Sequence, residues 1–347
     1  MEHIRIRKKS NGEKAIPVYH SLSSLQKVRW CFSNAYSTRG IGWSWGTAHL
    51  PPAPPAGSSQ SSFLILSLRR ILQQYVIHDI AGALLLWLTD SGRTSILDLH
   101  FVPQILATGC WWASTIPPMD IVYHVICLFG VTSGLFWNVI EEVHPLKGAW
   151  AMCYTLNNFW NRTWHQNFRR ALKTPSRYVA RHVACAPKGS WASRQIQYHI
   201  AFAISGIYHW AAAKMAIRSE NFTKTLAFFA IMPIIMLLED LAISVAREQL
   251  GWRSWRWRVV GYLWTFFALT LLSVGFVDDC VRHGLVTSFP ALPFSPTHTI
   301  LNLWVRSKIW CLTDNMEYHL EGSHSCRAFR SAFLEEETGT TYPWYLS

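Results

Sequence analysis

The sequence predicts an all-α integral membrane protein with about five to seven helices in the bilayer. Three observations support this fold class: few charged residues, long apolar runs, and positive charge gathered on one side of those runs. Half of the 347 residues are hydrophobic and only 15% are charged. Soluble domains carry about 25% charged residues, so this composition argues against a soluble globular domain.

The predicted order of the chain follows from apolar segments that are long enough to cross a bilayer as helices. Five such segments run over residues 71–88, 121–140, 196–217, 225–246 and 259–277. A sixth, shorter segment over 101–116 ends at two consecutive prolines, which predicts a re-entrant or interfacial piece instead of a span. We therefore expect about five spans, give or take two.

Composition divides the chain into three parts. Residues 1–60 form a basic region that ends in a proline-rich linker, and no apolar run follows the basic start. We expect this end to stay in the cytosol, because a secretory signal needs such a run. Residues 61–284 hold all the predicted spans, whereas residues 285–347 predict a polar tail without one.

Lysine and arginine gather on one predicted side of the membrane. With five spans, the N-terminal region lies on the same side as residues 141–195 and 247–258, which hold clusters of Lys and Arg. The short segments on the opposite side, 89–120 and 218–224, hold only three Lys or Arg residues. The positive-inside rule assigns the first side to the cytosol. The same rule explains the net charge of +12 without nucleic acid, for which the sequence has no binding motif.

The sequence predicts no bound metal and no bound cofactor. Its eight cysteines show no CxxC spacing and no pairing with clustered histidines. It also lacks a glycine-rich phosphate loop, a GxSxG elbow and an HExxH helix.

Polar residues are concentrated in residues 155–170, with the sequence TLNNFWNRTWHQNFRR. Interpreted as one helix, this segment places Asn158, Asn161 and His165 on one face beside Trp164. About forty residues later, the segment AISGIYHW contains a lone His209 in an apolar run.

His209 needs a compensating environment if its segment spans a bilayer, because an ionisable residue there costs about 2.5 to 3.5 kcal/mol. Such residues are often functional, although a histidine can also donate one hydrogen bond across a helix interface and do nothing else. Ser205 lies one turn earlier on the same face. Gly206 would let a neighbouring helix or an acyl chain approach closely.

The two segments together resemble a known family. FWNRTWHQ followed by SGIYH is similar to the wax-synthase-like branch of the membrane-bound O-acyltransferases, and RGIGWSW at 39–45 resembles a segment of its fungal members. The resemblance covers residues 37–284. It implies that His209 is the catalytic base and that His165 is its polar partner, at the thioester carbonyl or beside His209. His165 can also be an interfacial histidine on an amphipathic helix.

Substrate binding is assigned to a set of polar and aromatic side chains around these two histidines: Asn161, Trp164, Ser205, Arg169 and Arg170. The two arginines can pair with the phosphates of coenzyme A or, equally, with anionic lipid headgroups. Glu239 and Asp240 form an unusual carboxylate pair inside a predicted span. They must face the protein interior, pair with Arg or His, or stay partly protonated, and a proton-relay or acceptor-site role is open.

The resemblance implies an enzyme of the endoplasmic reticulum membrane that moves an acyl group from acyl-CoA, with acetyl-CoA preferred, to a hydroxyl of a hydrophobic acceptor such as a terpenoid. A long-chain alcohol, giving a wax ester, is the alternative acceptor. A membrane carrier is a second class, and a truncated, inactive member is a third, since family members usually carry further helices before the RGIGW segment.

Overall fold

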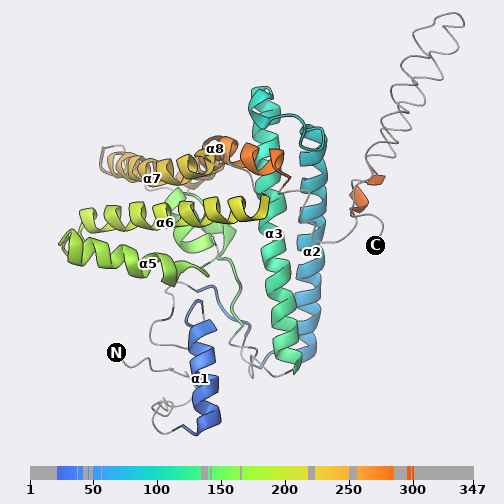
Figure 1. Cartoon of the computed structure of the whole chain (residues 1–347), viewed down its shortest axis with the longest axis vertical. Helices are drawn as coiled ribbons and strands as arrows, with labels where there is room; N and C mark the ends of the chain where they lie inside the picture. Colours follow the sequence, from blue (N-terminus) through green and yellow to red (C-terminus); the bar gives the residue numbers. More distant parts are fainter. Residues whose placement is uncertain are drawn as a thin grey trace, which may run out of the picture. The chain divides into compact units, whose positions relative to one another are not determined.

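The computed structural model describes most of the chain between Leu22 and Gly284 and a few residues beyond it. These are residues 22–36, 38–41, 46, 50–55, 57–133, 140, 143–164, 166–217, 223–249, 256–284, 295–297 and 299–300. The chain divides into two units, residues 1–295 and 296–347, and the helices discussed below all belong to the first. The described residues form helices and no strand, which confirms the all-α prediction (Figure 1).

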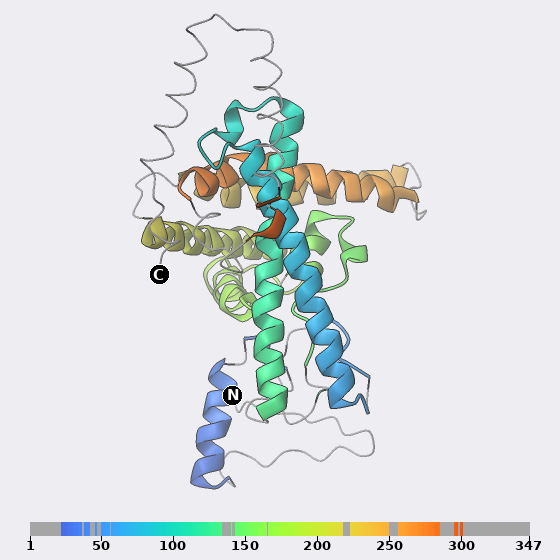
Figure 2. The same ribbon diagram turned by 90° about the vertical axis from the view of Figure 1, so that its right-hand side faces the viewer.

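The first long helices form a pair. After α1 (Ser24–Tyr36), α2 (Gln60–Leu88) and α3 (Phe101–Ser133) lie side by side, as two perpendicular views agree (Figures 1 and 2). Ser59 begins α2, because its side chain accepts the N–H of Ser62 at 3.1 Å. Along the chain, the short helix η2 (Ile96–Asp98) follows α2 and precedes α3.

Helix α3 runs without a break through Pro117 and Pro118, so the prediction that a short piece ends there and a separate span begins at 121 is wrong. A proline removes the N–H that would bond the carbonyl four residues earlier, which is Ser114 in the case of Pro118. His78 of α2 compensates, since its Nδ1 lies 2.7 Å from that carbonyl oxygen. Neighbouring groups therefore keep the helix intact where the sequence alone signals a break.

The second group of helices follows residue 143. It comprises η4 (Trp150–Met152), α4 (Leu156–Asn158), the π-helix η5 (Phe159–Thr163), α5 (Arg169–Tyr178), the π-helix η6 (Val179–Val183), α6 (Trp191–Ile217), α7 (Thr223–Gln249) and α8 (Arg256–Arg282). Helix α6 packs against both α5 and α7, and α8 packs against α7 and α3.

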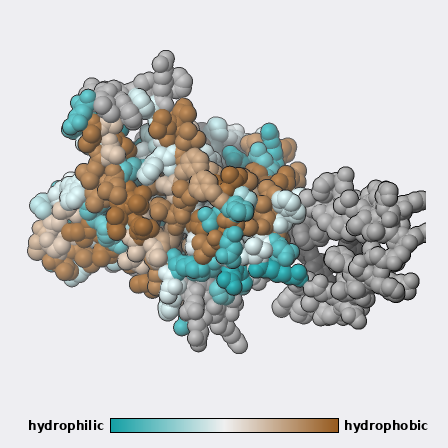
Figure 3. All heavy atoms as spheres, turned by 90° about the horizontal axis from the view of Figure 1, so that it is seen from above, coloured by the Kyte–Doolittle hydropathy of each residue, from teal (hydrophilic) through white to brown (hydrophobic). Residues whose placement is uncertain are grey.

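Within the described residues, four helices are long and apolar enough to cross a membrane: α2, α3, α7 and α8. Large hydrophobic side chains cover their outer surfaces, such as Leu72 of α2, and hydrophobic residues occupy much of the face in Figure 3. Helix α6, a predicted span, has 27 residues but is not one of these four. The prediction of a polytopic helical membrane protein is confirmed.

The largest buried cluster is rich in aromatic rings and joins the two groups of helices. Trp111 of α3, Phe228 and Phe229 of α7, and Phe276 of α8 belong to it, and the partly buried Trp112 of α3 packs against it. Phe228 and Phe276 stack with their ring centroids 5.5 Å apart. Because aromatic side chains bury large areas, this cluster fixes where α3, α7 and α8 meet.

A second fastening lies where α7 begins and α8 ends. The Asp278 carboxylate is fully buried and accepts hydrogen bonds from the Ser95 hydroxyl at 2.8 Å and the Ile96 N–H at 2.9 Å. Lys224 pairs with Asp278 at 2.9 Å and with Asp279 at 3.3 Å. One carboxylate thus ties η2 to the start of α7 and the end of α8, and no pattern in the sequence predicted this role.

Candidate active site

The segment 155–170 is a set of short turns, so the single-helix interpretation is wrong. The Thr155 hydroxyl accepts the N–H of Asn158 at 3.0 Å and starts α4, which widens at once into the π-helix η5. The helical turns end at Trp164, whose backbone is extended. His165 lies outside the described residues, so its predicted role stays a prediction.

Glu239 of α7 holds the start of this segment. Its carboxylate accepts the N–H groups of Leu156 at 2.8 Å and Asn157 at 3.2 Å, and the indole N–H of Trp264 at 2.8 Å. Glu239 is only 4% exposed. It therefore faces the interior, as one of the predicted possibilities required, and three N–H donors stand in place of an Arg or His partner.

A polar cluster forms where α4 and η5 meet α6. The Asn161 side chain donates from Nδ2 to Asn157 Oδ1 at 2.7 Å, and the Tyr198 hydroxyl lies 3.4 Å from the same oxygen. Asn161 was predicted from the sequence as a site residue, whereas Asn157 and Tyr198 were not. The spacing of Asn157 and Asn161, four residues apart, was the signal that could have linked them.

Arg169 is engaged within the segment itself. Its Nη1 donates to the Asn161 carbonyl at 2.9 Å and to Gln166 Oε1 at 2.5 Å. Gln166 in turn donates to the Trp164 carbonyl at 2.8 Å. Arg169 thus braces the turn that follows η5, a role that the sequence assignment to phosphates or headgroups did not anticipate.

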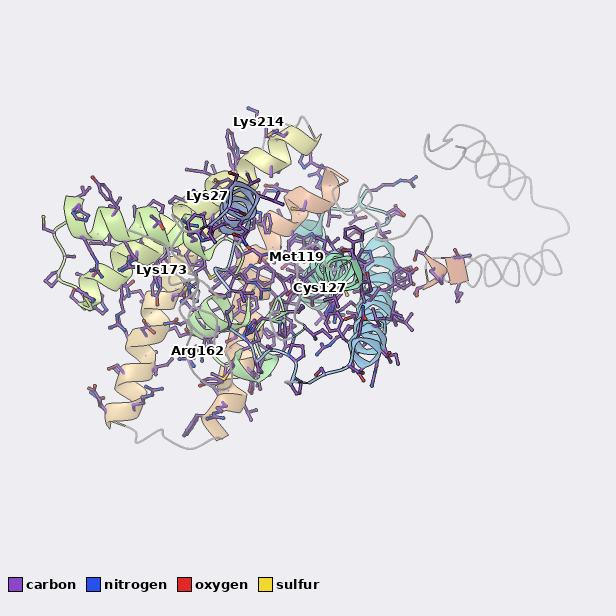
Figure 4. All side chains as sticks on the ribbon, turned by 90° about the horizontal axis from the view of Figure 1, so that it is seen from below. Lys27, Met119, Cys127, Arg162, Lys173 and Lys214 are labelled. Carbon is purple, nitrogen blue, oxygen red and sulfur yellow. The ribbon has the colours of Figure 1, made fainter. Side chains whose placement is uncertain are left out.

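The cationic side chains of α5 form a row along one side of the helix. Arg169, Lys173 and Arg177 are spaced one turn apart, and partial desolvation together with the charges of the two arginines lowers the pKa of Lys173. Arg170 is exposed on the same helix. Figure 4 labels Lys173 and, on η5, Arg162, both of which are also exposed. Exposed cations on this side are compatible with either predicted partner, coenzyme A phosphates or lipid headgroups.

His209 lies on α6 against an aromatic face. Its ring stacks on Phe229 of α7, with centroids 4.8 Å apart and an interplanar angle of 16°, and it meets Phe276 of α8 edge-on at 6.2 Å. A Cβ added to Gly206 would lie 2.9 Å from the Phe229 Cβ, so the close approach of a neighbouring helix at Gly206 is confirmed. Ser205 beside it is half-buried.

A continuous series of rings joins His209 to the 155–170 segment. Phe229 lies 6.5 Å from Phe202, Phe202 lies 5.4 Å from Trp160, and Trp160 lies 5.8 Å from Trp164, all as centroid distances. Tyr198 and His209 are eleven residues apart on α6, which is about 16 Å along a helix. The aromatic layer, and not a direct polar contact, connects the two predicted parts of the site among the described residues.

The RGIGW segment reaches the same region through its first residues. The Arg39 guanidinium is buried and donates to the carbonyls of Pro145 at 2.6 Å and His144 at 3.0 Å, and to the Tyr123 hydroxyl at 2.8 Å. It fastens the N-terminal part to α3 and to the loop that leads into η4. Residues 42–45 of this segment lie outside the described residues.

Across the part of the chain that the structure describes, no three His, Cys, Asp or Glu side chains are grouped as metal ligands would be.

Part of the chain matches the model of a known protein family. The model of the Membrane bound O-acyl transferase family matches residues 143–231. This range begins in the loop that Arg39 contacts, covers the 155–170 segment and His209, and ends in α7 just after Phe229.

Several curated fungal proteins are similar to most of this chain. Acetyltransferase ple2 of Rhodocybe pseudopiperita is 27% identical over 70% of this chain and 64% of its own length. Acetyltransferase eriL of Hericium erinaceus is 25% identical over 81% and 74%, and acetyltransferase aurG of Calcarisporium arbuscula is 25% identical over 86% and 74%. The chain thus spans about two thirds of the length of ple2. No solved structure matches it.

Proposed function

We propose that the chain transfers an acyl group from acyl-CoA to a hydroxyl of a hydrophobic acceptor, with His209 as the general base. The match of residues 143–231 to the Membrane bound O-acyl transferase family and the similarity to fungal acetyltransferases support this proposal. The relatives named above are called acetyltransferases, which favours acetyl-CoA as the donor. Their fungal origin favours a secondary-metabolite alcohol, such as a terpenoid, as the acceptor.

The observation that carries this proposal is the placement of His209. The imidazole stacks on Phe229 at 4.8 Å, in an aromatic layer that continues to Trp160 and Trp164 of the 155–170 segment. Stacking restricts the orientation of the imidazole while the residue stays exposed to an incoming hydroxyl, and a general base needs both. The same apolar surroundings suit an acceptor that is itself hydrophobic.

The proposed chemistry is direct transfer. His209 takes the proton of the acceptor hydroxyl while the hydroxyl oxygen forms a bond to the acyl carbon. The carbon–sulfur bond then breaks, and the coenzyme A thiolate leaves and takes up the proton from the imidazolium. His165 would assist at the thioester carbonyl. No acyl-enzyme forms, so we expect ternary-complex kinetics; ping-pong kinetics would contradict this scheme.

We expect the protein to lie in the endoplasmic reticulum membrane and the acyl-CoA donor to arrive from the cytosol. Whether four helices cross the bilayer or α6 crosses as well, two candidate spans, α2 and α3, precede the 155–170 segment among the described residues, so it stays on the N-terminal, positively charged side. The exposed cations Arg170 and Lys173 lie on α5, immediately after this segment. They are the candidates for contact with coenzyme A phosphates or lipid headgroups.

The test is acyl transfer by microsomes from cells that express the chain, with labelled acetyl-CoA and a panel of terpenoid and long-chain alcohols. We expect the parent chain to label a terpenoid ester and His209→Ala to lose at least about 99% of that rate, because removing a general base costs about 10²–10⁴-fold. His199→Ala is the matched control, since His199 is an exposed histidine of α6 like His209, but its Nδ1 lies 2.9 Å from the Gln195 carbonyl of its own turn, whereas the His209 ring stacks on Phe229.

Each other outcome points elsewhere. Label in long-chain esters alone would make the chain a wax ester synthase. Equal labelling with and without His209 would refute the base assignment, and a loss confined to His165→Ala would move the base to that residue. If no acyl-CoA yields an ester, an inactive member or a carrier becomes the better account.

A further inference from the structure

Helix α7 contacts both parts of the proposed active site. We propose that α7 holds the 155–170 segment and His209 in register, and that Glu239 is the positioning residue that fixes the segment to it. This inference rests on the proposed function for its catalytic half. Its structural half concerns only how the segment is held.

Glu239 is suited to hold a helix start. The first N–H groups of a helix have no partner within it, and negative charge near them is favourable. The Thr155 hydroxyl satisfies the N–H of Asn158, and the two oxygens of Glu239 satisfy those of Leu156 and Asn157 at 2.8 and 3.2 Å. Every N–H of the three-residue helix α4 therefore has an acceptor outside the turn, and α7 supplies two of them.

The other contact of α7 lies ten residues earlier. Phe229 presents its face to His209 at 4.8 Å. Between Phe229 and Glu239 the fully buried Met232 and Met236 face the core, so this side of α7 is packed throughout. Ten residues of helix extend about 15 Å, and that spacing is set by the backbone. One continuous helix, which runs through Pro233, therefore carries both the face that orients the base and the carboxylate that holds the polar segment.

A proton-relay role for Glu239 fits this geometry poorly. Both carboxylate oxygens are occupied by N–H donors, and the third donor is the indole of Trp264 on α8. None of these three donors can pass a proton on at neutral pH, whereas all three favour an acceptor that stays in place. The arrangement favours fixation over proton transfer.

The decisive variant is Glu239→Gln, which keeps the size but turns one oxygen into a donor that faces an N–H group. We expect amide hydrogen exchange at Leu156 and Asn157 to accelerate, and kcat for ester formation to fall about tenfold or more, as for the loss of a hydrogen bond to a charged group. The KM for acetyl-CoA should change by less than about twofold, since the variant disturbs alignment and not donor binding.

Two controls separate positioning from general damage. Glu248→Gln makes the same change on the same helix at an exposed carboxylate that bonds Ser244, and it should leave exchange and kcat unchanged. Trp264→Phe removes the third donor but leaves both backbone bonds, so exchange at Leu156 should stay slow. If Glu239→Gln fails to accumulate, Glu239→Asp retains the charge one methylene further back and should give the same effects in weaker form.

Two results would overturn the inference: exchange at residues 156–158 unchanged in Glu239→Gln, or faster exchange with an unchanged kcat. If the parent chain forms no ester, the proposed function fails and the catalytic half of the inference falls with it. Hydrogen exchange then still decides whether Glu239 anchors the segment, so the two failures are distinguishable.

Discussion

Two buried carboxylates fasten short helical turns at different places in this protein, and they do so with different partners. Glu239 of α7 holds the turn at Leu156 with neutral N–H donors alone. Asp278 of α8 holds the turn at Ile96 with one N–H and one hydroxyl, but it also pairs with Lys224. The first anchor supports the proposed active site, whereas the second joins the ends of α7 and α8.

The difference teaches what each anchor contributes. A carboxylate opposite a cation stabilises the fold through charge, so its loss should appear first in stability. A carboxylate opposite aligned backbone N–H groups mainly sets geometry, so its loss should appear first in turnover. Each anchor also has a glycine of α8 packed beside it. Gly261 faces the Tyr154 backbone next to the Glu239 anchor, whereas Gly275 faces the side chain of Lys224, which pairs with Asp278.

Breaking the charged anchor should have the largest effect on stability. Asp278→Asn removes one of the two carboxylates that pair with Lys224 and neutralises a buried acceptor of two further hydrogen bonds, so we expect the free energy of unfolding to fall by about 3 kcal/mol. Thermal unfolding in detergent measures it. A loss equal to that of Glu239→Gln would remove the distinction between the two anchors.

The second largest loss of stability is expected when a side chain is added next to the Glu239 anchor. A Cβ at position 261 would lie 2.2 Å from the Tyr154 carbonyl oxygen, so backbone must move in Gly261→Ala. We expect a loss of about 2 kcal/mol, typical of overpacking, together with lower turnover. Unfolding and ester formation are measured on the same preparation; an unchanged turnover would count against the dependence of the site on this contact.

The corresponding change at the other anchor should be milder. In Gly275→Ala the nearest atoms are Lys224 Cδ at 3.2 Å and Cβ at 3.3 Å; the Cδ can move by side-chain rotation, and the Cβ contact needs only a small shift of the helix. Alanine also favours a helix over glycine by about 0.5–1 kcal/mol, so the net change in stability should stay within about 1 kcal/mol. A loss larger than that of Gly261→Ala, in the same unfolding assay, would reverse the comparison.

The smallest effect is expected where a carboxylate is exposed. Asp90 and Arg93 approach to 4.0 Å with both side chains about two-thirds exposed. Asp90→Asn should change the free energy of unfolding by less than about 0.5 kcal/mol, as for surface ion pairs in general. It serves as the control for Asp278→Asn, and a comparable loss in both would mean that burial is not what distinguishes them.

The sequence was sufficient for what depends on composition and pattern. Apolar runs predicted α2, α6, α7 and α8, and the proximity of Gly206 to a neighbouring helix followed from its lack of a side chain. Local sequence signals misled where contacts outside the helix determine whether it continues. Pro118 did not end α3, because His78 bonds the Ser114 carbonyl that Pro118 leaves free, and the helical turns of η5 end at Trp164 although the pattern predicted a longer helix. The roles of Glu239, Tyr198 and Asp278 depend on contacts across long stretches of chain, which no local pattern reports.

The continuity of α3 has a consequence for how the chain enters the membrane. An unsatisfied carbonyl in hydrocarbon costs several kcal/mol, and Pro118 leaves that of Ser114 without its usual donor. The replacement comes from His78 on α2, and a neighbouring carbonyl, that of Ile116, accepts a further bond from Lys147 in the following loop. Helix α3 is therefore poorly suited to insertion by itself, and α2 and α3 are expected to leave the translocation machinery together, as a hairpin.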